Sequence, residues 1–179
     1  KLWANAESRD DVSEAHALGA AGVGLYRTEF LFLASNVLPD EEAQFRAYRD
    51  AVLAMTGRTV TIRTLDLGAD KADKTGLALR DEPNPALGLR GVRLSLARPD
   101  LLHTQMRAIG RASGYGPIRV LVPMVTAVEE MQAVRSALNT ALAELRAEGR
   151  EVAAHIPLGA MIEVPSAALA LPSFIGGCD

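Results

Sequence analysis

Two arginines and one glutamate stand where they could act together on an anion. Arg27, Arg63 and Glu163 each come directly after a short apolar run. A guanidinium offers a planar fork of N–H donors to phosphate or carboxylate oxygens and keeps its charge near neutral pH. A carboxylate beside that anion would repel it unless it held a cation, and a hard oxygen ligand next to a phosphate indicates Mg²⁺. The pattern therefore predicts an anion clamp of Arg27 and Arg63 with a metal ligand at Glu163.

Such a site needs a scaffold that gathers the ends of several strands. The apolar runs have the composition of buried parallel strands. They cover residues 2–4, 23–26, 60–62, 120–122 and 158–162. Helical patterns lie between them, and they cover 10–19, 40–55, 100–114 and 126–149. The last of these opens with Thr126 and Glu129 in capping-box spacing.

This alternation of strand and helix predicts an α/β fold, a partial (β/α)8 TIM-type barrel of parallel strands with surrounding helices. Neither a G-x-G-x-x-G nor a G-x-x-x-x-G-K-[ST] loop opens a helix, which argues against a nucleotide-binding sheet. No linker divides residues 1–179, so we expect a single barrel domain, truncated at its C-terminal side. In a barrel the chemistry lies in the loops that follow the strands, where Arg27, Arg63 and Glu163 are found.

The composition limits the partners and the compartment. The chain has 179 residues, of which 49% are hydrophobic and 23% charged, as in ordinary globular proteins. A formal net charge of −3 provides no basic surface, so we expect no nucleic-acid partner. A single cysteine, Cys178, cannot form an internal disulfide, and no segment has the form of a membrane span or signal peptide. We expect a cytoplasmic protein without membrane insertion.

Each candidate residue also has a structural interpretation. Arg27 could pair with Glu29 and Arg63 with Asp66, as salt bridges that only hold loops in place. Glu163 could be a favourable charge in the first turn of a helix. The sequence leaves both interpretations open.

The histidines and the cysteine lack the neighbours that catalysis or metal binding would need. His16, His103 and His155 show no metal-ligand spacing and have no nucleophile nearby. Cys178 lies in a small-residue loop without a histidine close in sequence. We expect no catalytic residue within this chain.

Five stretches, in this order along the chain, resemble the phosphoenolpyruvate (PEP)-utilising enzymes. They are residues 22–32, 63–71, 84–90, 122–124 and 161–165. The run Arg-Thr-Glu-Phe-Leu-Phe at 27–32, followed by Leu-Pro-Asp-Glu-Glu at 38–42, is most similar to the PEP-protein phosphotransferase branch, the first enzyme of the sugar phosphotransferase system. Two mild departures are Ala69, where that family usually has a second glycine, and Val164, where a threonine is common.

The resemblance implies roles for four residues. Arg27 and Arg63 would bind the phosphate of PEP, Arg90 would line the same pocket, and Glu163 would be one of two carboxylate ligands of Mg²⁺. The phosphoryl group would pass to a histidine on a separate N-terminal domain, then to a histidine-containing phosphocarrier protein in sugar uptake. The full-length protein would be a homodimer.

Several residues that the family needs have no counterpart among these 179. They are the phosphorylated histidine, the second metal carboxylate, an asparagine beside it, a further arginine, and the cysteine that protonates pyruvate. We therefore expect the chain alone to catalyse no phosphoryl transfer and to bind PEP weakly. Two alternatives remain: the barrel of a PEP synthase or pyruvate phosphate dikinase, and a non-catalytic interaction module. The sequence on either side of this segment in its gene would distinguish them.

Overall fold

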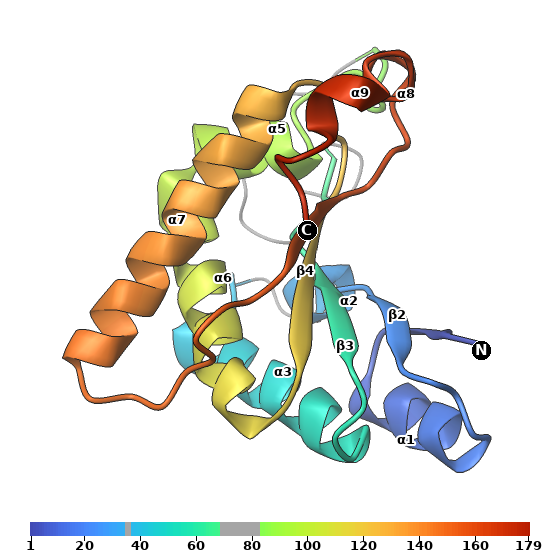
Figure 1. The fold of residues 1–179 in the computed structure, drawn as a ribbon, viewed down its shortest axis with the longest axis vertical. Coiled ribbons are helices and arrows are strands. Elements are labelled where there is room, and N and C mark those ends of the chain that lie inside the picture. Colours follow the sequence, from blue (N-terminus) through green and yellow to red (C-terminus); the bar gives the residue numbers. More distant parts are fainter. Residues whose placement is uncertain (35–36, 69–82) are drawn as a thin grey trace.

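The computed structural model describes residues 1–34, 37–68 and 83–179. Within these residues, five parallel strands form one sheet in the order β1-β2-β3-β4-β5 (Figure 1). The strands are β1 Ala4–Ala6, β2 Val23–Tyr26, β3 Val60–Arg63, β4 Ile118–Val122 and β5 Leu158–Ala160. The helices are α1 Arg9–Ala17, α2 Glu29–Leu33, α3 Glu41–Ala54, α5 Gly91–Ala97, α6 Pro99–Ala112, α7 Val128–Ala147, α8 Pro165–Leu169 and α9 Leu171–Phe174, with a 3₁₀ turn at Ser113–Tyr115.

The strand order confirms the predicted α/β class. A doubly wound sheet reverses its order at a switch point, whereas here each new strand joins the same growing edge of the sheet. Sequential parallel order is that of a barrel wall. The structure is thus an α/β sheet with surrounding helices, as expected for part of a (β/α) barrel.

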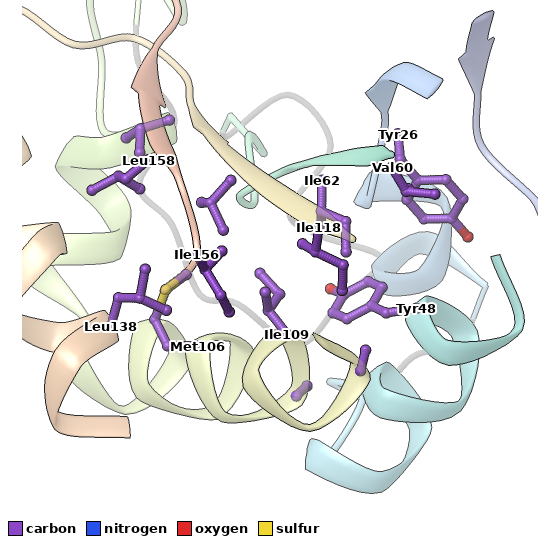
Figure 2. Close-up of a cluster of buried hydrophobic side chains, with 14 of the residues drawn as sticks. Tyr26, Tyr48, Val60, Ile62, Met106, Ile109, Ile118, Leu138, Ile156 and Leu158 are labelled. Carbon is purple, nitrogen blue, oxygen red and sulfur yellow. The ribbon is translucent and has the colours of Figure 1, made fainter. Parts of the chain in front are cut away.

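The core lies between the sheet and helices α3, α6 and α7 (Figure 2). Alternate strand residues point toward these helices, so Val60 and Ile62 of β3 are fully buried while Thr61 and Arg63 face the other way. The side chains that fill this layer are Tyr48, Val60, Ile62, Met106, Ile109, Ile118, Leu138 and Leu158. The helix-facing side of the sheet is therefore apolar, and polar side chains such as Thr61 and Arg63 lie on the opposite side.

Ion pairs join the outer surfaces of α3, α6 and α7. Two arginines of α6 each contact carboxylates of a neighbouring helix: Arg107 meets Glu41 at 2.6 Å and Arg111 meets Glu42 at 2.6 Å. We call this set the outer ion-pair network. Its members are Glu41, Glu42, His103, Arg107, Arg111, Glu144 and Glu148.

A chain of buried polar side chains runs from α3 to the loops that follow the strands. The Tyr48 hydroxyl donates to Gln44 at 3.2 Å and accepts from the Gln105 side-chain amide at 3.0 Å. The Gln105 carbonyl oxygen in turn accepts the Leu65 backbone N–H at 3.0 Å. Burial raises the pKa of the Tyr48 hydroxyl above its ordinary value. These bonds hold the loop after β3 against α6.

Several predicted boundaries were wrong. The first strand is Ala4–Ala6 rather than 2–4, because Ala4 and Ala6 pair with β2 and Leu2 is 86% exposed. The strand expected at 158–162 ends at Ala160. The capping box expected from Thr126 and Glu129 does not form; α7 begins one residue later, and Glu130 accepts the Ala127 backbone N–H at 3.0 Å.

Candidate functional site

Arg27 and Arg63 lie side by side at the carboxyl edge of the sheet. In the pairing of β2 with β3, Tyr26 is opposite Ile62, so the next residues in each strand are Arg27 and Arg63. Neighbouring strands are about 5 Å apart, and residues in register point to the same face. Since Tyr26 and Ile62 point into the helical core, both arginines are directed to the opposite face.

Arg63 is the most enclosed of the candidate arginines. Its side chain is 12% exposed, and its Nη2 lies 3.2 Å from the Glu29 carboxylate and its Nη1 3.8 Å from Asp66. Nη1 also lies 3.9 Å from the Met161 sulfur beyond β5. Its buried Nε has no hydrogen-bond partner among the described residues. A buried N–H donor without an acceptor is unfavourable, so this atom is a natural point of attachment for an anionic oxygen.

Arg90 joins the same cluster through Asp66. The guanidinium donates to both Asp66 oxygens, from Nε at 2.9 Å and from the second nitrogen at 3.0 Å. Asp66 is 5% exposed and also faces Arg63, so one carboxylate lies between two guanidiniums. Arg90 is the residue that precedes helix α5, which places it at the rim beside β3 and β4. The structure thus brings Arg63 and Arg90 together.

Arg27 has a different partner from the one its sequence suggested. It forms an ion pair with Glu7, which follows β1, and its side chain is 42% exposed. The alternative pairing of Arg27 with Glu29 is wrong, because Glu29 contacts Arg63 instead. The alternative pairing of Arg63 with Asp66 is confirmed at 3.8 Å. Arg27 and Arg63 therefore each form a salt bridge and still lie at the rim.

Glu163 lies at the rim beyond β5 and is tied to the neighbouring loop. Its Oε1 accepts the backbone N–H of Met124 at 2.8 Å, which links the loops after β4 and β5. Met124 has a φ of 59°, an uncommon left-handed conformation for a residue with a side chain. The second oxygen of Glu163 has no partner among the described residues and is exposed to solvent. An exposed carboxylate oxygen on a fixed side chain fits one ligand of a hard divalent cation.

The carboxylates needed for a complete metal site are not grouped here. Within the described part of the chain, no cluster of three or more His, Cys, Asp or Glu side chains could hold a metal ion. Glu29 and Asp66, the described carboxylates within the arginine cluster, are already engaged by arginines. Glu163 thus has the chemistry of one ligand of a hard cation, without further carboxylates grouped around it in the described part of the chain.

Among the described residues, the three arginines of the cluster are matched by three carboxylates. Each guanidinium faces a carboxylate, so an anion bound here would be held by directed donors and not by an excess of positive charge. The paired residues are Arg27 with Glu7, Arg63 with Glu29 and Asp66, and Arg90 with Asp66.

The histidines and the cysteine, which were not predicted to belong to the site, lie away from this rim. His103 bonds the half-buried Glu144 at 2.8 Å in the outer ion-pair network, and His155 lies 3.5 Å from Asp179. Cys178 is a free, half-buried thiol. Ala69, which departs from the family pattern, lies outside the described residues.

A known protein family matches the chain over its whole length. The family model described as "PEP-utilising enzyme, PEP-binding domain" matches residues 1–179, the whole chain. The chain belongs to this family. It is 47% identical over 180 residues to a PEP-protein phosphotransferase of Cupriavidus necator, covering 99% of this chain and 31% of that protein. Proteins of the same name from Haemophilus influenzae and Listeria monocytogenes are 46% identical (93% of this chain, 29% of that protein) and 43% identical (100% and 31%).

Sequence reasoning missed two carboxylates of this PEP-binding domain. Glu7 was not considered, and Glu29 was considered only as a partner of Arg27. The position of Glu29 two residues after Arg27 was a usable signal, whereas nothing near Glu7 marked it. As a further property of the domain, no helix among its described residues is both long and apolar enough to cross a bilayer.

Proposed function

We propose that this chain is the PEP-binding part of an enzyme that transfers the phosphoryl group of PEP to a protein histidine. From there the group passes to a histidine-containing phosphocarrier protein, in the uptake of sugars. Residues 1–179 then form a single barrel domain whose remaining strands lie beyond its C-terminal side. The chain spans 31% of the Cupriavidus necator relative and 29% of the Haemophilus influenzae relative, so the histidine would belong to another part of the whole protein.

One observation carries the proposal: two arginines that share a buried carboxylate stand at the rim with a third beside them. Arg63 is 12% exposed and Arg90 25% exposed, and Asp66 lies between them. Arg27 lies next to Arg63 in strand register. In this account Arg27 and Arg63 bind the phosphate of PEP and Arg90 lines the same pocket. Phosphoryl transfer needs mainly positioning and neutralisation of charge, which such donors supply without any acid or base.

Glu163 would hold Mg²⁺ as one of its two carboxylate ligands. Bound Mg²⁺ would offset the negative charge of the phosphate oxygens, which the paired arginines and carboxylates of the cluster leave uncompensated. Met124 fixes the orientation of Glu163 through its backbone N–H. The whole enzyme would act in the cytoplasm as a homodimer.

The proposal is tested by PEP-dependent phosphorylation of a full-length protein that carries this domain. Replacing Arg63 with alanine should lower kcat/KM by roughly 10²- to 10³-fold, the typical loss for one donor to a transition-state oxyanion. Arg46→Ala is the matched control, because Arg46 is 65% exposed on α3 and pairs only with Glu42 in the described structure. Phosphorylation by Arg63→Ala at the wild-type rate would contradict the proposal.

A further inference from the structure

Glu29 lies between the two loops that carry the candidate arginines. It begins helix α2, directly after β2, and is 8% exposed. Its Oε1 accepts the backbone N–H of Asp66 at 3.0 Å and lies 3.2 Å from Arg63 Nη2. One buried oxygen thus contacts both the arginine and the loop that follows it.

The neighbouring residue strengthens the same link. The Thr28 hydroxyl donates to the backbone carbonyl of Arg63 at 3.0 Å and is almost fully buried. Thr28 and Glu29 therefore attach the start of α2 to the end of β3 through both backbone and side chain. Because these bonds are buried, water does not replace them easily when one is lost.

The contact extends from Glu29 to Arg90 by way of Asp66. Glu29 fixes the Asp66 backbone, and the Asp66 carboxylate receives two hydrogen bonds from the Arg90 guanidinium. The side chains of Glu29 and Asp66 are only 11% and 5% exposed. Both guanidiniums are thereby oriented by groups that are themselves immobilised.

We propose that Glu29 is a positioning residue, which orients Arg63 directly and Arg90 through Asp66 before phosphate binds. The inference rests on the proposed role of these arginines in phosphate binding. By occupying Nη2 of Arg63, Glu29 directs the remaining donors, including the buried Nε without a partner in the described structure, toward the site. A donor that is already oriented loses less conformational freedom on binding.

Simple electrostatics and a positioning role predict opposite effects on phosphate binding when the charge of Glu29 is removed. A carboxylate close to an anion site repels the anion, so removing its charge should tighten binding. Positioning predicts weaker binding, because the neutral amide oxygen of a glutamine can still accept from Asp66 but makes a weaker hydrogen bond with Arg63 than the carboxylate oxygen does. The guanidinium of Arg63 is then held less firmly in its orientation.

The experiment compares Glu29→Gln with the wild-type chain in a titration with inorganic phosphate. The Nε–Hε signal of Arg63 in an ¹⁵N NMR spectrum reports both order and binding. We expect Glu29→Gln to broaden this signal before phosphate is added and to raise the phosphate Kd by at least about fivefold. Glu41→Gln is the matched control, since Glu41 also pairs with two arginines but lies in the outer ion-pair network. It should leave the phosphate Kd unchanged.

The outcomes separate the inference from the proposed function. Unchanged or tighter phosphate binding by a folded Glu29→Gln variant overturns the positioning role and leaves the phosphate site standing. An Arg63 signal in the wild-type chain that phosphate never shifts overturns the proposed site and this inference with it. If circular dichroism shows that Glu29→Gln is unfolded, the same phosphate titration is made with Glu29→Asp. The aspartate keeps the charge, but its shorter side chain cannot reach both Arg63 and the backbone N–H of Asp66. Wild-type phosphate binding by folded Glu29→Asp overturns the inference.

Discussion

At the residue scale, the three candidate arginines differ mainly in burial. Arg63 is 12% exposed, Arg90 25% and Arg27 42%. Removing a buried guanidinium leaves the negative charge of its buried carboxylate partner without compensation. When the pair is exposed, water solvates the remaining carboxylate instead. Stability and binding should therefore respond differently at Arg27 and at Arg63.

Arg63→Ala should destabilise the fold by roughly 3–5 kcal/mol, because Glu29 and Asp66 lose a buried partner. Arg27→Ala should cost less, about 1 kcal/mol, since the Arg27 side chain is 42% exposed and water can reach the Glu7 carboxylate, 19% exposed, when the arginine is removed. Urea unfolding of the two variants measures both values. Equal losses for the two variants would show that burial does not distinguish the sites.

Sequence reasoning reached the residue types of the site but not all of its partners. Arg27, Arg63 and Glu163 were recognised because each follows an apolar run, which is a local pattern. The pairing of Arg27 with Glu7 depends on β1 lying beside β2, and the pairing of Arg63 with Glu29 depends on how α2 folds back. Such partners follow from tertiary geometry, which a single sequence does not display.

At the element scale, α3, α6 and α7 are held together inside by apolar packing and outside by the outer ion-pair network. Three of its carboxylates have a lowered pKa because of hydrogen bonds from a neighbour: Arg111 to Glu42, His103 to Glu144, and Arg107 to Glu148. A lowered pKa means that the folded state favours the charged carboxylate.

Acid should therefore weaken the contacts between these helices. A carboxylate with a lowered folded pKa stabilises the fold above its unfolded pKa, here 4.5, and loses that contribution as the pH falls through the folded pKa. We expect the melting temperature to fall as the pH drops below 4.5, and to fall less steeply in the double variant Glu144→Gln and Glu148→Gln. Thermal scans across this range, monitored by circular dichroism, measure both slopes. Identical slopes would exclude the network as the source.

The apolar contacts should contribute more than the surface charges. Met106 of α6 has no exposed surface and packs in the layer between the sheet and the helices (Figure 2). Met106→Ala should cost about 2–5 kcal/mol of stability, as large-to-small substitutions in a core do. Leu53→Ala on α3 is the control, because Leu53 is 53% exposed. Chemical denaturation that shows equal effects would mean that this layer is not closely packed.

Long periodic helices were predictable, whereas short ones were not. The patterns of α3 and α7 extend over 14 and 20 residues, enough to show an apolar stripe. Helices α2, α8 and α9 have 5, 5 and 4 residues and did not stand out. Helices this short are not stable by themselves, so their position is set by tertiary contacts.

At the scale of the whole molecule, the long helices α6 and α7 lie to one side of strands β3 and β4 (Figure 1). On the other side there is a hollow of about 480 Å³, lined by Thr61, Arg119, Leu121 and Gly159 among others. The C-terminal segment adds large exposed apolar side chains. They are Ile162, Leu169, Leu171 and Ile175.

These exposed apolar groups should cause the isolated chain to associate. Ile175 is 80% and Leu169 87% exposed, and apolar side chains gathered on a surface favour contact with another molecule. We expect the mean sedimentation coefficient to rise with protein concentration, and the double variant Ile175→Lys and Leu169→Lys to suppress that rise. Sedimentation velocity at several concentrations tests this. A wild-type chain that is monomeric throughout would contradict it.

The order of strands in the sheet was predictable because it follows from local alternation and the geometry of parallel connections. The resemblance also predicted that this segment carries only part of the site, and that stays a prediction. Glu163 is an example. The backbone N–H of Met124 fixes its carboxylate, yet the described residues form no cluster of ligands that could hold a metal.

The central claim is that Arg27, Arg63 and Arg90 form one site for the phosphate of PEP. An ¹⁵N NMR titration of the chain with PEP in the presence of Mg²⁺, which follows the arginine Nε–Hε signals, tests it most directly. We expect the signals of these three arginines to shift together with one common Kd, while those of Arg46 on α3 and Arg135 on α7 do not move. Shifts absent from the three, or shared equally by all five, would contradict it.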